Sequence, residues 1–235
     1  DAQRLGHADA ALEVHAGIAG NQRNTIEFFE KIEMPIGTAE LAIRDALEAD
    51  RQLIERTQRP SEAATLSLRA AQSALKANRL DDGLAFLGHA IELVPHHIVA
   101  QLELAAILEQ TSNFAGAAAA YEAAAAASES PAERAFYLYR AAILWQDKAN
   151  DLGRARASLE SVAHLDPAYN DVFTRLQAIY VAEGARAELA ALLERRLDAV
   201  TDPAERVEME VLRGRALADV GDAAAAKRAL AAALE

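Results

Sequence analysis

Polar and apolar residues along most of this chain follow the periodicity of amphipathic helices. Leucine, alanine and other apolar residues recur among charged ones in runs of about 15 residues, and each run is bounded by helix-breaking residues. Few segments show the alternation of Val, Ile and Thr that predicts a strand. The chain is also rich in alanine, the best helix former. These patterns predict an all-α protein.

Prolines divide these runs at a nearly constant spacing. The interval is 35 residues from Pro60 to Pro95, and then 36 residues to each of Pro131, Pro167 and Pro203 in turn. Proline is favoured in the first turn of a helix, where its missing N–H is no loss. A proline at this period therefore marks the start of each unit in a repeat array.

Each unit carries a second break near its middle. Asparagine and glycine end a helix at low conformational cost, and a following aspartate, here Asp81, Asp151 or Asp222, can cap the next helix. One unit is thus a helix, a tight turn and a second helix, and neighbouring pairs must stack to bury their apolar faces. The predicted breaks are Asn78, Ser112, Asn150, Gly184 and Gly221.

One helix start occurs twice. The tetrapeptide Pro-Ala-Glu-Arg follows Ser130 and again follows Asp202, two units apart. We predict that both preceding residues are N-caps, with proline at the first helical position. Glu133 and Glu205 are then placed to reach back to the cap in the manner of a capping box.

These units resemble the tetratricopeptide repeat. The clearest match is 75–95, where Gly83, Leu87, Ala90 and Pro95 occupy the small, large, small and proline positions of that repeat. The similarity covers about 62–235, although the period near 36 exceeds the usual 34. The resemblance implies an all-α, right-handed superhelical solenoid of antiparallel helix pairs.

The predicted organisation has two parts. Residues 1–60 form an N-terminal helical segment, in which 6–20 resemble the second helix of a partial or divergent repeat. A long helix is expected from near Thr38, and it could cap the array, pack in its groove or mediate self-association. We also expect the chain to be a fragment of a longer protein. The array is predicted to consist of five helix pairs, at 61–95, 96–130, 131–166, 167–202 and 203–235.

Charge and composition narrow the range of functions. The net charge is −12, which argues against a protein that holds nucleic-acid phosphates. No run approaches the roughly 20 apolar residues of a membrane-spanning helix, so membrane insertion is not expected. Cysteine is absent, which excludes thiolate chemistry and fits a reducing compartment, so we expect a cytoplasmic location.

No motif of a common enzyme class occurs in the sequence. His89, Glu92 and His96 share one helical face, and Glu160 and His164 form a similar pair, but such groupings are common on helix surfaces. We therefore predict no catalytic residue, no metal site and no cofactor. Helix–helix packing positions are predicted for the aromatic residues Phe114, Tyr121, Tyr137, Trp145 and Tyr180.

The resemblance implies that the first helix of each unit lines a concave groove. Arginines there would hold carboxylates bidentately, and aromatic rings would add contact area, which suits an extended acidic peptide. The alternative is that the arginines pair with Glu103, Asp147 or Asp171 and only solubilise this face. The candidate peptide-binding residues are Arg69, Gln72, Lys76, Phe136, Tyr139, Arg140, Arg175 and Arg215.

The sequence thus predicts a non-catalytic protein-interaction scaffold that binds a partner peptide or domain through the groove. The expected partner is another protein or peptide, and an acidic one would suit the basic stripe; nucleic acid is not expected. The alternative is a self-assembling structural module that forms a homo-oligomer through its helical faces. An enzyme that uses one of the histidine–carboxylate faces is a distant third.

Overall fold

The computed structural model describes residues 36–198 and 200–234. These residues form eleven helices, α3 to α13, and no strand, which confirms the predicted all-α class. The segment 6–20, predicted to resemble part of a repeat, lies outside the described residues. By compactness the chain divides into two units, one ending at Thr111 and the other beginning at Ser112.

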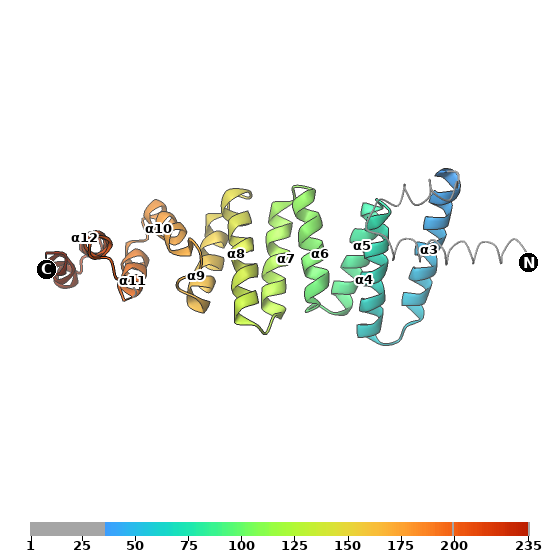
Figure 1. Cartoon of the computed structure of the whole chain (residues 1–235), viewed down its shortest axis with the longest axis horizontal. Coiled ribbons are helices and arrows are strands. Elements are labelled where there is room, and N and C mark those ends of the chain that lie inside the picture. The colour runs from blue at the N-terminus through green and yellow to red at the C-terminus, as the bar shows by residue number, and fades with distance from the viewer. Residues whose placement is uncertain (1–35, 199, 235) are drawn as a thin grey trace, which may run out of the picture. The chain divides into compact units, whose positions relative to one another are not determined.

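The first unit contains four helices, each packed on the next (Figure 1). They are α3 (Ile36–Arg56), α4 (Pro60–Lys76), α5 (Leu80–Leu93) and α6 (Ile98–Gln110). The helix α3 is the long helix expected from the sequence, and it begins two residues before Thr38. The core of this unit is closely packed, because Ala64, Ala71 and Leu87 are fully buried.

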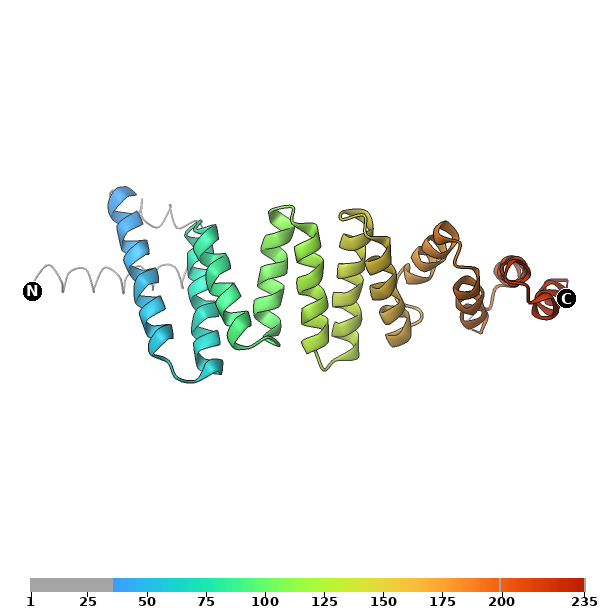
Figure 2. The same cartoon turned by 180° about the vertical axis from the view of Figure 1, so that it is seen from behind.

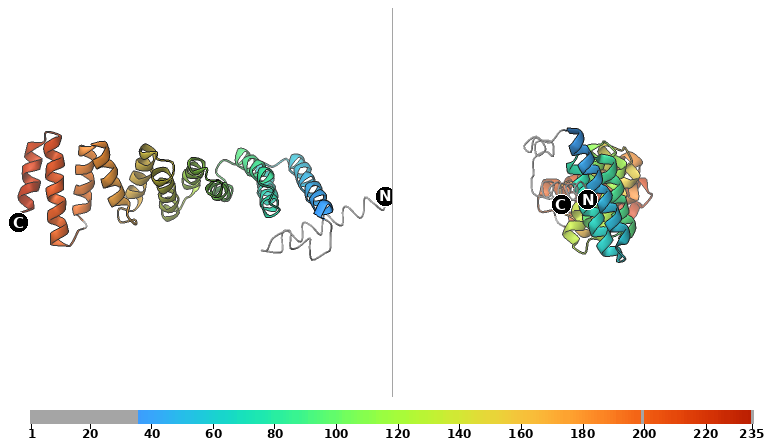
Figure 3. Two further views of the ribbon diagram at one scale, coloured as in Figure 1. Left: turned by 90° about the horizontal axis from the view of Figure 1, so that it is seen from above. Right: turned by 90° about the vertical axis from the view of Figure 1, so that its right-hand side faces the viewer.

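The second unit contains seven helices, again with each packed on its successor in the chain (Figures 1 and 2). They are α7 (Phe114–Ala127), α8 (Pro131–Asp147), α9 (Leu152–Leu165), α10 (Val172–Glu183), α11 (Arg186–Leu197), α12 (Pro203–Asp219) and α13 (Ala223–Ala232). The antiparallel pairs α10–α11 and α12–α13 are seen most clearly from above (Figure 3). We call α4, α6, α8, α10 and α12 the first helices, and α5, α7, α9, α11 and α13 the second helices.

All five predicted mid-unit breaks adopt the left-handed backbone conformation. Their φ angles are 57° at Asn78, 61° at Ser112, 56° at Asn150, 70° at Gly184 and 85° at Gly221. Glycine and asparagine take this conformation readily, whereas other residues are strained in it. The breaks therefore mark the places where the backbone must leave the helix, and Ser112 is the least suited of the five to do so.

The aspartates that follow these breaks cap helices in two of three cases. Asp151 and Asp222 each accept a hydrogen bond from the backbone N–H three residues further on, at 3.0 and 2.9 Å. The prediction that Asp81 is an N-cap is wrong, because α5 begins at Leu80, before Asp81, and has Arg79 as its N-cap. Asp81 lies instead in the first turn, where its charge favours the helix dipole.

For the repeated helix start, the predicted N-caps are confirmed, but the predicted capping box is wrong. Ser130 accepts from the backbone N–H of Glu133 at 3.4 Å, and Asp202 accepts from the N–H two residues further on at 3.2 Å. The carboxylate of Glu133 does not reach the cap, because the Ser128 hydroxyl already accepts the backbone N–H of Ser130. That hydroxyl donates to Glu133 at 2.7 Å, and Glu205 lies 3.7 Å from an arginine of α11.

The left-handed serine provides a test of these turns. Replacing Ser112 with glycine should raise the free energy of unfolding by about 0.5–1 kcal/mol, because glycine has no Cβ to strain. The matched control is Ser161→Gly in the interior of α9, which should lower it by a similar amount. Urea unfolding followed by circular dichroism measures both, and an equal loss in the two variants would contradict the assignment.

Candidate functional site

A polar cluster joins the first helices α8 and α10. The Tyr139 hydroxyl donates to Asp171, whose other carboxylate oxygen accepts from Arg175 Nε at 2.9 Å. Arg175 Nη1 also donates to Gln146 Oε1 at 2.8 Å and lies 3.3 Å from Asp147 Oδ1. The structure thus brings together two of the predicted peptide-binding residues, Tyr139 and Arg175, through a carboxylate that both share.

The charges of this cluster support one another. Burial raises the pKa of Tyr139, and the neighbouring Asp171 carboxylate raises it further. The hydrogen bond from Tyr139 is the main cause that holds the pKa of Asp171 below its ordinary value, with the Arg175 charge acting in the same direction. Burial alone would lower the pKa of Arg175, but Asp171 and Asp147 together raise it. At neutral pH Tyr139 is therefore a neutral phenol, Asp171 is a carboxylate and Arg175 is a guanidinium.

Two more aromatic residues, Tyr169 and Phe136, lie in the same elements as this cluster or directly before them. The Tyr139 ring lies 5.4 Å from the ring of Tyr169, a residue of the turn before α10. Phe136, one turn earlier on α8, is 50% exposed and meets Tyr137 edge to face at 5.6 Å. Tyr169 was not predicted as a site residue, because its position in a turn gives no indication that it faces the first helix of the preceding pair.

The remaining predicted residues of the second unit lie apart from this cluster. The Arg140 guanidinium lies 5.7 Å from the centre of the Tyr121 ring, a cation–π contact with the second helix α7. Arg215 on α12 is exposed, and it makes no ion pair or hydrogen bond with the residues that the structure describes. Of the arginines predicted in this unit, Arg175 is the one that pairs with Asp147 and Asp171, as the alternative interpretation proposed.

Three candidate residues lie on α4 in the first unit. Gln72 Nε2 donates to Glu103 Oε1 at 3.0 Å, which links the first helices α4 and α6. Glu103 therefore accepts from the side-chain amide of Gln72, whereas the alternative interpretation predicted that it would pair with an arginine. Arg69 and Lys76 are exposed on the same helix. That the predicted basic stripe runs on into the second unit stays a prediction.

A second polar network holds the helices behind the first-helix face. Glu122 on α7 accepts from Trp145 Nε1 at 2.8 Å and from Ser158 Oγ at 2.9 Å, so one carboxylate ties α7 to both α8 and α9. Trp145 and Tyr180 are 4% and 5% exposed, which confirms their predicted packing role. The role of Glu122 was not predicted. A buried indole N–H requires an acceptor, so a buried tryptophan is a signal that an acceptor lies nearby.

The histidine–carboxylate groupings form no metal site among the described residues. His89 Nδ1 lies 2.9 Å from the hydroxyl oxygen of the buried Ser67, which fixes this ring within the first unit. Within 36–198 and 200–234, none of the helices combines the length and the apolar character needed to cross a membrane.

Known proteins give limited similarity to this chain. No family model matches it, and no curated protein matches it. Among solved structures it is similar to YrrB, a TPR protein with an unusual peptide-binding site, at 17% identity and a TM-score of 0.41, over 80% of this chain and 92% of that one. It is also similar to BtubC (BKLC) from P. vanneervenii, at 20% identity and a TM-score of 0.40, over 83% of each chain.

The class of the protein rests on its own helices. Successive helices pack on one another within each unit, and prolines start the first helices α4, α8 and α12. A left-handed residue separates the two helices of each pair. These features define a tetratricopeptide-like helical repeat protein. The hand of the superhelix stays a prediction.

The polar cluster predicts how stability depends on pH. Because the pKa of Asp171 is lower in the folded chain, its contribution is present above the unfolded-state pKa and is lost as the pH falls through the folded-state value. Replacing Asp171 with asparagine should cost about 0.5–1 kcal/mol at pH 7, because the carboxylate is partly exposed, and much less near pH 3. Urea unfolding at both pH values measures the difference.

The control for this experiment is Asp198→Asn, at an exposed aspartate that forms no ion pair with the described residues. It should cause no loss at pH 7, because a negative charge at the C-terminal end of α11 is not favoured by the helix dipole. A cost of Asp171→Asn that is the same at both pH values would contradict the role of the carboxylate.

Proposed function

We propose that this chain is a non-catalytic protein-interaction scaffold that binds a partner peptide on the first-helix face of the second unit. The observation that carries the proposal is the half-exposed Phe136 ring on α8, three residues before Tyr139. Exposed aromatic side chains in fixed positions are typical of residues that contribute most to binding between proteins.

The polar cluster supports the proposal through rigidity. Asp171 and Arg175 hold Tyr139 between two helices, so its ring has little rotational freedom left to lose on binding. In this proposal Arg175 positions the surface, because Asp147 and Asp171 already bind its guanidinium. Acidic groups of a partner would instead meet Arg215, an exposed cation on α12.

Photo-cross-linking tests this face directly. We expect p-benzoylphenylalanine in place of Phe136 to form defined adducts with a partner on irradiation in lysate. Adding Arg215→Glu should reduce the adduct yield about fivefold or more, because it replaces an attractive charge with a repulsive one. The control places the same photoreactive residue at Leu152, which is 40% exposed at the start of the second helix α9. Equal adducts from the two positions would remove the first-helix face from consideration.

The alternative of a self-assembling module has an observation of its own. Val207 and Val220 of α12 and its turn are 42% and 48% exposed, and Leu230 of α13 is 41% exposed. Light scattering separates the two functions, because the scaffold should remain a monomer as its concentration rises. A discrete assembly that is lost on changing these three residues to serine would support self-assembly.

A further inference from the structure

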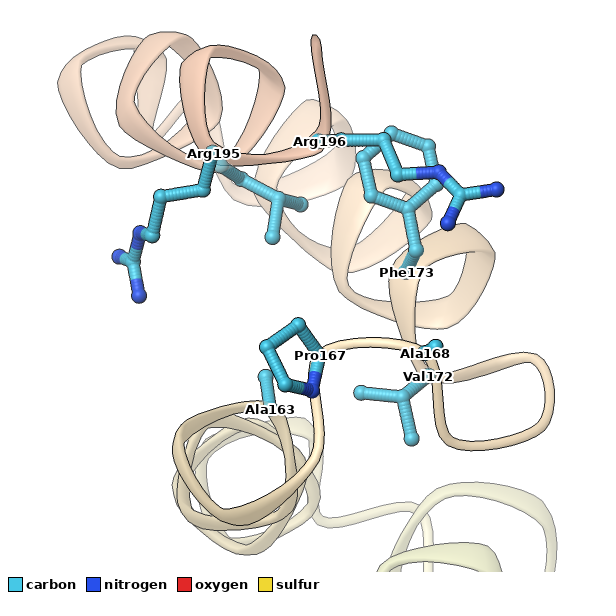
Figure 4. Close-up of a pocket in the computed structure, with 8 residues that line it drawn as sticks. Ala163, Pro167, Ala168, Val172, Phe173, Arg195 and Arg196 are labelled. Atoms are coloured by element: carbon cyan, nitrogen blue, oxygen red, sulfur yellow. The ribbon is translucent and has the colours of Figure 1, made fainter. Parts of the chain in front are cut away.

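Two pockets lie one repeat apart in the second unit, each bordered by the ends of two second helices and the start of a first helix, and we call the side that they share the second-helix face. The first has a volume of about 370 Å³ and lies between the ends of α7 and α9 and the start of α8. The second, of about 60 Å³, lies between the ends of α9 and α11 and the start of α10 (Figure 4). The two pockets therefore have the same construction, with α9 as their shared wall.

Both pockets have apolar walls. Ala125 and Leu138 contribute to the first pocket, and Ala163, Pro167 and Val172 contribute to the second. In Figure 4 these last three residues face the end of α11 across the second pocket. Apolar walls of this kind favour the insertion of an aliphatic side chain.

Basic side chains border both pockets. Arg134 and His164 line the first, and Arg195 and Arg196 line the second. Arg134, His164 and Arg195 are exposed, and they form no ion pair with the described residues. Arg196 lies over the Phe173 ring at 5.6 Å and is 3.7 Å from Glu205. The chain thus keeps three uncompensated basic groups here although its net charge is −12.

Helix dipoles do not account for all of these groups. Histidine or arginine is favoured in the last turn of a helix, which suits His164 and Arg195. Arg134 lies at the start of α8, where the dipole disfavours a cation. The acidic residue that lines the same pocket, Glu122, is already bound by Trp145 and Ser158. Among the described residues, Arg134 therefore has no partner that would explain its charge.

A pocket in the first unit provides a contrast. It has a volume of about 180 Å³ and is lined by residues of α3 and α5, among them Arg51 and His89. Here Arg51 pairs with Asp82 and Glu48, and His89 is bonded to Ser67. Its basic groups are thus satisfied within the chain, whereas Arg134, His164 and Arg195 of the second unit form no ion pair with the described residues.

We propose that the second-helix face of the second unit is a separate binding site for an acidic linear peptide. One aliphatic side chain of the peptide enters each pocket, and its carboxylates meet Arg134, His164 and Arg195. This site lies at the ends of α7, α9 and α11 and the starts of α8 and α10, and Phe136, Tyr139 and Arg215 do not line it.

The two pockets share α9 as a wall, so one extended peptide can present a side chain to each. A polyproline II peptide returns to the same face every three residues, so aliphatic residues at positions i and i+3 face the protein together. Acidic residues and proline complete the probe. The second pocket is the smaller of the two, so the smaller aliphatic residue, valine, is placed to enter it.

The test uses a fluorescein-labelled peptide, Glu-Glu-Leu-Pro-Glu-Val-Glu-Glu, and fluorescence anisotropy with the whole chain. We expect saturable binding that weakens as salt rises. Changing both aliphatic residues to serine should abolish binding, and so should changing valine to tryptophan. Replacing the glutamates with glutamine should weaken binding about tenfold and remove the salt dependence.

Variants of the chain locate the site. Arg134→Glu and Arg195→Glu should each weaken binding about fivefold or more. Ala126→Phe should abolish Leu insertion, because Ala126 is an exposed residue that lines the first pocket. Arg215→Glu, an identical charge change on a first helix, is the matched control and should leave binding unchanged. Circular dichroism and urea midpoints confirm that each variant is folded.

Three outcomes would overturn the proposal. One is binding that Ala126→Phe and Arg195→Glu leave intact, and another is an equal loss in Arg215→Glu. The third is a dimer in sedimentation equilibrium that Arg134→Glu and Arg195→Glu dissociate, which would make a second copy of the chain the occupant. Each is independent of cross-linking at Phe136, so failure here leaves the first-helix proposal standing.

Discussion

The close approach of neighbouring helices is the constraint on which this structure depends. Fully buried alanines such as Ala71, Ala90 and Ala142 stand where larger side chains would push the helices apart. A methyl group added at Gly83 would lie 2.6 Å from Leu75 Cδ2, and one at Gly214 would lie 2.7 Å from Leu230 Cγ. The small residues thus fix the helix spacing, and that spacing decides which surface side chains can meet.

Helix positions were predictable because their signals are local. A proline at the first turn, or an asparagine or glycine that leaves the helix at positive φ, acts through its own backbone and needs no distant partner. Partner choice was less predictable, because it depends on several nearby groups that compete for one atom. Ser128 occupies the donor that a capping box would assign to Glu133. The sequence named Asp147 as one possible arginine partner but not which arginine would reach it, and Arg175 does so across a helix interface.

The two sides of the second unit treat charge differently. On the first helices, Asp171 and Arg175 satisfy each other and so create a fixed polar base beneath aromatic rings. On the opposite side, Arg134 at the start of α8 and Arg195 on α11 border apolar pockets and form no ion pair with the described residues. A charge that is paired within the chain helps to hold side chains in place, whereas an unpaired charge attracts a ligand of opposite charge from a distance. One array can in this way present a rigid contact surface and an electrostatically attractive one.

The carboxylate shared by Trp145 and Ser158 has a spectroscopic consequence. Trp145 is the single tryptophan of the chain, and its indole lies between the Glu122 carboxylate and the Arg154 guanidinium, which is 4.5 Å from the ring centre. Its fluorescence therefore reports on the junction of α7, α8 and α9, and circular dichroism averages over every helix. In a repeat array, where stability is a sum of local terms, the two signals need not change together on unfolding. The tryptophan thus makes the local stability of this junction measurable without any label.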